Sequence, residues 1–207
     1  NLRGKAKASI QFDGPLDLLG SHAMDSSRAS TVRLDTVSFQ LTKNRRRVTN
    51  LQASLSNQNN LADIHLALRY GDSDLKLSAK VENLMHRIFK NERVMHVIGK
   101  IESDHLYTRD LIMDSLRSPI IDDHASGLSL AFEANNLLPT ENATVDELAL
   151  QFMIRNLSTR FAKLPDIRDL DAQGIFRRNK QGIALVLKQF SLSLPEGSMA
   201  ISGDMTI

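Results

Sequence analysis

Alternation of apolar and polar residues is the dominant pattern of this chain. From Ile64 to Tyr70 every second residue is apolar, and the same alternation resumes from Leu75 to Val81. A period of two places one apolar and one polar face on a β-strand. Residues 71–74 between the two runs are glycine or polar, as expected of a hairpin turn. The pattern therefore predicts a β-hairpin.

The C-terminal stretch follows the same plan. Alternation runs from Phe190 to Leu194, breaks at a polar turn over residues 195–198, and resumes from Met199 to Ile207. The second run reaches the last residue without a terminating turn. We therefore expect the chain to be a fragment of a longer, repetitive β-rich protein whose next strand joins at this end.

Strands of the same kind are predicted along most of the chain. Alternation predicts further strands over residues 2–12, 32–41, 48–55, 94–102, 128–134, 145–154 and 167–176. Polar or irregular segments predict turns and loops at 16–30, 44–47, 56–60, 120–126, 137–143 and 177–182. Apolar residues at helical spacing predict short helices over 84–91 and 109–116, whereas 156–166 fits either helix or strand.

These elements predict a mainly β fold, an extended antiparallel sheet curled into a groove or half-barrel, with one or two short helices. We expect residues 1–207 to form a single β-rich module. The segment 48–53 (Val-Thr-Asn-Leu-Gln-Ala) is echoed by 167–172 (Ile-Arg-Asp-Leu-Asp-Ala). This echo suggests two repeat units, over about 32–118 and 128–207.

Composition narrows the functional classes. Hydrophobic residues make up 42% of the chain, which argues against general disorder, and the net charge of +2 gives no case for a nucleic-acid partner. The only basic run, residues 45–47, is interpreted as a solvated loop, with a phosphate or headgroup contact as the alternative. The absence of cysteine excludes disulfides and thiolate chemistry, and the absence of tryptophan argues against sugar- or base-stacking surfaces.

Metal-ligating patterns are weak. The nearest groups are residues 104–105 (Asp-His) and 122–124 (Asp-Asp-His), and neither has the spacing of a metal clamp. Asp72 and Asp74 offer two carboxylates in a turn, fewer than a calcium site needs. We therefore expect no metal and no cofactor.

Catalytic machinery is not recognisable either. Ser115, Asp110 and His105 supply the residue types of a hydrolytic triad, but no Gly-x-Ser-x-Gly motif accompanies them. No phosphate-binding glycine loop occurs. We expect no catalytic residues and no enzymatic activity.

Three features together resemble the AsmA-like family of bacterial envelope proteins. The first is the closing stretch 167–207, which contains L-x-L-x-x-x-S-M-A-I-S-G-D-M. The second is the strand 97–101, which leads through Leu106 into the helical segment 109–116. The third is a composition of many aliphatic residues, few aromatics and no cysteine.

This resemblance implies a periplasmic protein, held at the inner membrane by an anchor that lies outside this sequence. It also implies that the curled sheet binds or conducts phospholipid along an apolar groove and supports outer-membrane assembly. Phospholipid acyl chains are then the expected partner. The free edges of the sheet predict self-association through a terminal strand.

An apolar strand face suits acyl chains because each buried CH₂ contributes about 0.8 kcal/mol. The alternative is a structural or adhesive β-repeat scaffold in which the same side chains bury one another. The candidate groove residues are one alternating set: Ile64, Leu66, Leu68, Leu75, Leu77, Val81, Leu148, Leu150, Phe152, Leu192, Leu194, Met199, Ile201 and Met205.

Overall fold

The computed structural model describes residues 2–3, 9–13, 30–41, 47–84, 95–111, 120–135, 147–162, 166–179, 182–194 and 197–206. Most of the loop predicted over 16–30 (residues 16–29), the loop predicted at 137–143, most of the predicted helix 84–91 and the end of the predicted helix 109–116 lie outside them.

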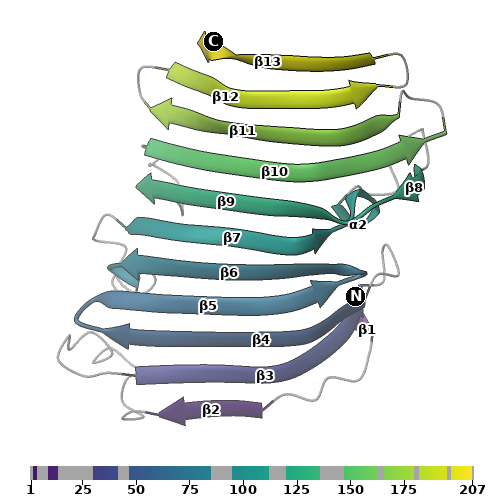
Figure 1. Cartoon of the computed structure of the whole chain (residues 1–207). Coiled ribbons are helices and arrows are strands. Elements are labelled where there is room, and N and C mark those ends of the chain that lie inside the picture. The colour runs from purple at the N-terminus through teal and green to yellow at the C-terminus, as the bar shows by residue number, and fades with distance from the viewer. Residues whose placement is uncertain are drawn as a thin grey trace.

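The described chain forms one antiparallel sheet of 13 strands that is not closed into a barrel (Figure 1). The strands are β1 (Leu2–Arg3), β2 (Ser9–Asp13), β3 (Ser30–Leu41), β4 (Arg47–Gln58), β5 (Leu61–Tyr70), β6 (Ser73–Glu82), β7 (His96–Leu106), β8 (Ile120–Asp123), β9 (Ser126–Asn135), β10 (Glu147–Phe161), β11 (Ile167–Asn179), β12 (Gly182–Leu194) and β13 (Gly197–Thr206). The mainly β, antiparallel fold expected from alternation is confirmed.

Strand order follows chain order with two exceptions. β1 and β2 both pair with β3, so the single strand predicted over 2–12 is two strands. β7 pairs directly with β9, while β8 lies off this path and pairs with the end of β10. Residues 120–126, predicted to be irregular, therefore contain a strand. Its polar residues are accommodated because Asp122 is exposed and Asp123 Oδ2 accepts a hydrogen bond from the Arg109 amide.

The two hairpin turns around β5 are shorter than the polar segments from which they were predicted. β4 continues through Gln58, so the turn to β5 is only Asn59 and Asn60, with φ of +52° and +64°. Asparagine tolerates this left-handed region, which two-residue hairpins need. β5 and β6 likewise join through Gly71 and Asp72 alone.

Two further boundaries differ from the predictions. β11 runs to Asn179, so Arg177 and Arg178 are strand residues and not part of a turn. β10 runs to Phe161, which resolves the ambiguous segment 156–166 as strand up to that residue. In both places the strand continues past the apolar alternation, because its polar residues pair with the neighbouring strands. The predicted helix at 109–116 is represented by α2 (Thr108–Leu111).

Several bulges lie toward one end of the strands. The register shifts between Thr49 and Gln52 in β4, between Ser103 and Leu106 in β7, and between Ile154 and Leu157 in β10. Because neighbouring strands are antiparallel, the start of β4 and the ends of β7 and β10 lie on the same side of the sheet (Figure 1). Bulges bend a strand and raise its twist, so they account for the curvature visible at this end.

Several of these irregular positions share a local sequence. Asn50, Asn156 and Asp169 have φ of +52°, +54° and +45°, and a leucine follows each of them. Asn50 and Asp169 are the matching positions of the echoed segments 48–53 and 167–172. The echo in sequence is therefore also an echo in backbone conformation.

Candidate functional site

One face of the sheet is apolar from strand to strand along the path from β3 to β12. Residues directly opposite one another in an antiparallel pair share a face, so the register identifies continuous rows. The central row contains Leu34, Ala53, Leu66, Leu77, Ile101, Leu130, Phe152, Gly174 and Leu187, one from each strand of this path. The next row contains Val32, Leu55, Ile64, Ala79, Gly99, Phe132, Leu150, Phe176 and Leu185. We call the surface formed by these two rows the apolar face.

Most side chains of the apolar face are half-buried. In the central row only Gly174 is buried, and none of the row is fully exposed. Leucine, isoleucine and phenylalanine on a sheet face are usually covered by a second layer, and here they retain part of their solvent access. The apolar face therefore has capacity to bury an additional apolar partner.

Two glycines on this face leave space for the phenylalanine ring opposite each of them. Gly174 lies opposite Phe152, and a Cβ added to Gly174 would come within 2.7 Å of the Phe152 ring. Gly99 lies opposite Phe132 in the same relation, with the Phe132 ring against the position of a Cβ. Each phenylalanine thus extends over the neighbouring strand's glycine. The rings lie along the sheet where a side chain on the next strand would otherwise stand.

The register of the sheet groups the candidate groove residues. Leu66 and Leu77 belong to the central row, as does Phe152, and the β5 and β6 candidates are paired as Leu68 with Leu75. Candidates in the last two strands follow by register, with Leu192 opposite Met199. The remaining pairings that place candidates are Ile64–Ala79, Val81–Ala62, Leu148–Ala134, Leu150–Phe132, Leu194–Gly197, Ile201–Phe190 and Met205–Leu185. Their role in binding stays a prediction.

A small core covers one corner of this surface. Ala62, Val81 and Val97 are buried there together with Met95, and Leu84 packs against them. Met95 and Leu84 come from the two ends of the connection between β6 and β7, not from a strand. In this corner the sheet is covered by its own chain.

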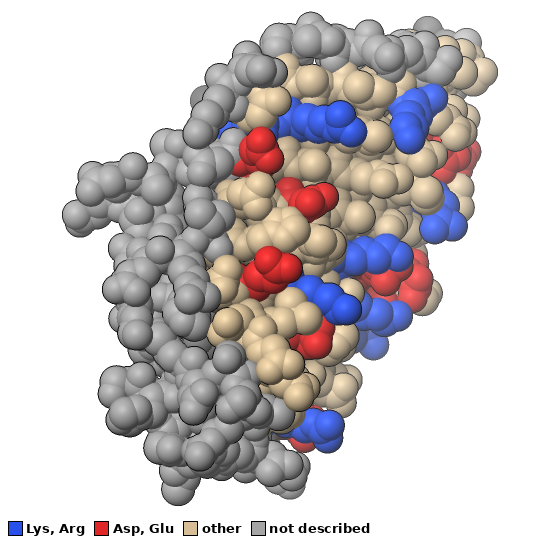
Figure 2. All heavy atoms as spheres, turned by 90° about the vertical axis from the view of Figure 1, so that its left-hand side faces the viewer, with Lys and Arg blue, Asp and Glu red and all other residues tan. Residues whose placement is uncertain are grey.

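The opposite face of the sheet is polar. Its rows include His65, Lys76 and Glu102, and Lys76 Nζ lies 3.0 Å from Asp104 Oδ2. Lys76 is exposed, and its hydrogen bond to Asp104 together with the carboxylate charge raises the pKa of Lys76. Figure 2, which looks along the strands from the left-hand side of Figure 1, shows acidic and basic side chains interspersed at this end of the sheet, without a patch of one sign. This mixture favours solvation over binding of a polyanion.

A polar junction ties the hairpin of β5 and β6 to helix α2. Asp110 is 6% exposed, and its Oδ2 accepts hydrogen bonds from the Ser73 amide (2.9 Å), the Ser73 hydroxyl (2.8 Å) and the Asp72 amide (2.9 Å). The Tyr107 amide in turn donates to Ser73 Oγ at 2.9 Å. Sequence reasoning missed this junction, because Ser73 and Asp110 are far apart in the chain. Asp110 serves as the buried acceptor that holds the turn.

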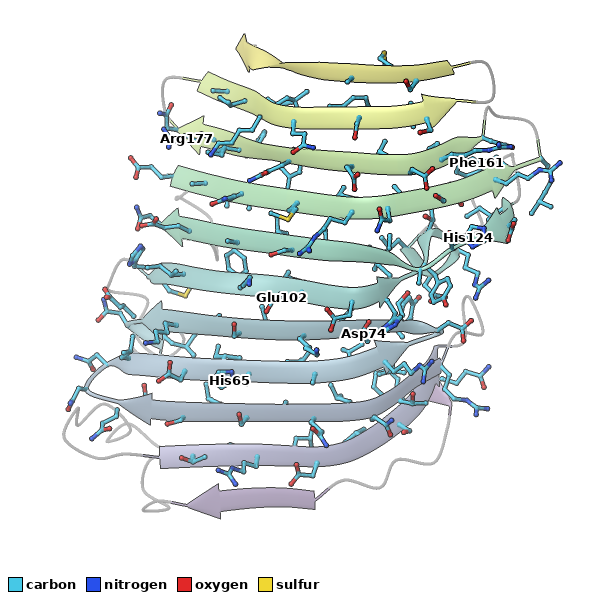
Figure 3. The ribbon with its side chains drawn as sticks, viewed as in Figure 1. His65, Asp74, Glu102, His124, Phe161 and Arg177 are labelled. Atoms are coloured by element: carbon cyan, nitrogen blue, oxygen red, sulfur yellow. The ribbon has the colours of Figure 1, made fainter. Side chains whose placement is uncertain are left out.

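The Asp-His groups named from sequence adopt structural roles here. His105 donates its backbone amide to Asp74 Oδ1 at 2.6 Å, and Asp123 Oδ2 accepts the Arg109 amide at 2.8 Å, at the start of α2. His124 lies 3.5 Å from Asp122, and both side chains are largely exposed. Figure 3 shows Asp74 and His124 toward one end of the strands and Arg177 at the other.

Asp74 is stabilised as a carboxylate. Burial by itself raises the pKa of Asp74, but hydrogen bonds from the His105 and Asp104 amides and the Ser103 hydroxyl outweigh it. The pKa is therefore held below its ordinary value. Asp74 thus links the beginning of β6 to the end of β7 through its charged form.

A hollow beside the end of β10 and the start of β11 is also polar. It has a volume of about 550 Å³ and includes Arg160, Asp166 and Arg168. Asp166 lies 3.4 Å from Arg168 and 3.9 Å from Arg160, so both guanidinium groups are neutralised in part by one carboxylate. Within the described chain, no group of three or more His, Asp or Glu residues is arranged to hold a metal ion. Ser115, the nucleophile of the triad considered from sequence, lies outside the described residues.

Among the helical residues that the structure describes, no helix is long and apolar enough to cross a membrane. Comparisons of the chain with protein-family models, with curated proteins and with solved structures found no match. The AsmA-like resemblance therefore stays a prediction based on the motifs in the sequence.

Proposed function

We propose that this chain is a non-enzymatic module that binds phospholipid acyl chains on its apolar face. The observation that carries the proposal is the central row, which crosses the sheet from Leu34 to Leu187 with its side chains half-buried. An acyl chain laid across this row would exchange water for leucine and phenylalanine contacts, at about 25 cal/mol per Å² of apolar surface buried.

The AsmA-like resemblance supplies the setting of this proposal. In this proposed setting, the chain is part of an inner-membrane-anchored protein of the bacterial periplasm that conducts phospholipid and supports outer-membrane assembly. The long open sheet is compatible with that setting, because a sheet lengthened by further strands would lengthen the apolar face in step. Most side chains of this face are aliphatic, so an acyl chain laid on them would bury apolar surface.

A second candidate function is a structural or adhesive β-repeat scaffold with a self-buried core. The observation that favours it is the corner where Met95 and Leu84 cover Ala62 and Val81. If comparable packing covers the whole face, no surface is left for lipid. The two functions differ in whether the isolated protein carries lipid.

Native mass spectrometry of the full-length protein extracted from bacterial membranes separates the two functions. We expect phospholipid to remain bound to wild-type protein and to be depleted in Leu130→Gln, which places an amide in the central row. Ala131→Gln is the matched control, because residue 131 is adjacent in β9 but lies on the opposite face. Circular dichroism melting checks that both variants are folded. Lipid-free wild-type protein would contradict the proposed function and favour the scaffold.

A further inference from the structure

Arg178 interrupts an otherwise uncharged row at the rim of the sheet. Ala134 lies opposite Leu148, Leu148 lies opposite Arg178, and Arg178 lies opposite Ile183. Leu148 alternates along β10 with Leu150 and Phe152, so Arg178 projects from the same side of the sheet as the apolar face. From β5 to β12 the row contains Ala62, Val81, Val97, Ala134, Leu148, Arg178 and Ile183.

The surroundings of Arg178 are amphipathic and open. Arg178 is exposed, and its neighbour Ile183 is 44% exposed. Phe176 and Gly174, members of the apolar face, follow Arg178 inward along the same strand. A guanidinium at the end of an apolar strip matches a molecule with an anionic head and an apolar tail, because Arg binds phosphate through paired N–H donors.

The adjacent Arg177 is in a different electrostatic setting. Arg177 lies opposite Ala149, which lies opposite Glu133, so it belongs to the polar face. A hollow of about 360 Å³ at the rim is lined by both arginines together with Glu133 and Glu147. Within the described chain, no salt bridge to a carboxylate is formed by Arg178. The positive charge on the apolar side is therefore available to an external anion.

We propose that Arg178 binds the phosphate of a phospholipid headgroup whose acyl chain lies along Phe176 and Gly174 toward the centre of the apolar face. This inference rests on the proposed function and adds the headgroup contact and the direction of the tail. It assigns β11 as the strand along which the bound lipid enters. The shared chemistry of the ligand is a phosphate ester, so free phosphate is the competing source.

Calorimetric titration with two lipids that share one acyl chain tests this assignment. Lysophosphatidylethanolamine carries the phosphate, and monoacylglycerol does not. We expect Arg178→Gln to weaken binding of lysophosphatidylethanolamine about tenfold, the scale of a lost charge-assisted hydrogen bond, and to leave monoacylglycerol binding unchanged. Arg177→Gln is the matched control, with the same charge change one residue away on the opposite face, and is expected to alter neither affinity more than about twofold.

Several outcomes would overturn the assignment. Unchanged binding of both lipids to Arg178→Gln would remove the headgroup contact while leaving the proposed function intact. Equal losses in Arg177→Gln and Arg178→Gln would indicate general electrostatic attraction. Inorganic phosphate that binds wild-type protein as tightly as lysophosphatidylethanolamine would identify a free-phosphate site. Failure of wild-type protein to bind either lipid would overturn the proposed function together with this inference.

Discussion

Residue 174 must be glycine because its neighbours leave no room for a Cβ, and not because of its backbone conformation. A Cβ there would lie 2.6 Å from the Val186 carbonyl oxygen and 2.7 Å from the Phe152 ring. The ring could rotate away, but the backbone oxygen cannot. The alternation of apolar residues does not reveal this constraint, because the partners come from two other strands.

Gly174→Ala is therefore expected to destabilise the fold by about 1–3 kcal/mol through overpacking. Gly127→Ala is the control, since its Cβ would meet only the Arg155 Cβ at 3.7 Å, an ordinary contact. Its free energy of unfolding should change by less than about 0.5 kcal/mol. Urea unfolding measures both values, and equal losses in the two variants would contradict the close contact.

Asp110 is expected to matter more for stability than any exposed carboxylate. Asp110→Ala leaves the Ser73 and Asp72 amides without their acceptor and should cost about 2–4 kcal/mol. Asp104→Ala removes only an exposed salt bridge to Lys76 and should cost less than about 1 kcal/mol. Thermal or urea unfolding compares the two. A loss for Asp110→Ala no larger than for Asp104→Ala would contradict the role of the junction.

At the scale of the strands, residues in the left-handed backbone conformation determine where β4, β10 and β11 bulge. The Asn-Leu or Asp-Leu step recurs at Asn50, Asn156 and Asp169, each with positive φ. Asn and Asp tolerate this conformation at lower cost than β-branched residues. The bulges could not have been predicted from this dipeptide alone, since it also occurs at ordinary positions such as Asp74-Leu75.

Asn156 provides the test of this conformational requirement. Asn156→Gly should be nearly neutral, whereas Asn156→Val should cost about 1–3 kcal/mol, because a β-branched side chain disfavours positive φ. Arg155→Val, on the same strand without positive φ, is expected to change stability by less than about 1 kcal/mol. Equilibrium unfolding measures the three variants. Equal tolerance of valine at both positions would contradict the bulge as a fixed feature.

The hydrogen bonds of Asp74, which connect β6 to β7, predict that the stability of the fold depends on pH. The folded pKa of Asp74 lies below the ordinary value of 3.8, so its carboxylate stabilises the fold above that pH and loses this contribution as pH falls through the folded pKa. Asp74→Asn should be less stable than wild type near pH 7, by about 0.5–1 kcal/mol, and the difference should shrink below pH 3.8. Urea unfolding at several pH values measures it. A difference that is constant with pH would contradict the charged contact.

At the scale of the whole molecule, alternation was sufficient to predict most of the strands and the single antiparallel sheet. It placed Leu66, Leu77 and Phe152 on one face because the period of two is preserved within each strand. It did not predict the neighbour order of β7, β8 and β9, which depends on long-range pairing. It also assigned Arg178 to a turn, so the charge at the rim of the apolar face was missed.

The apolar face makes the central claim directly measurable, because consecutive residues of β9 point to opposite faces. Leu128, Leu130 and Phe132 lie on the apolar side, and Ser129, Ala131 and Glu133 lie between them on the other. A photoreactive amino acid placed at each of these positions reports contact with phospholipid in cells. The readout is the same whichever headgroup the bound lipid carries.

Lipid cross-linking along β9 should alternate with a period of two. Adducts are expected at Leu128, Leu130 and Phe132 and should be few at the three intervening positions. Uniform adducts, adducts on the polar face, or none at any position in a folded and correctly expressed protein would contradict lipid binding on the apolar face.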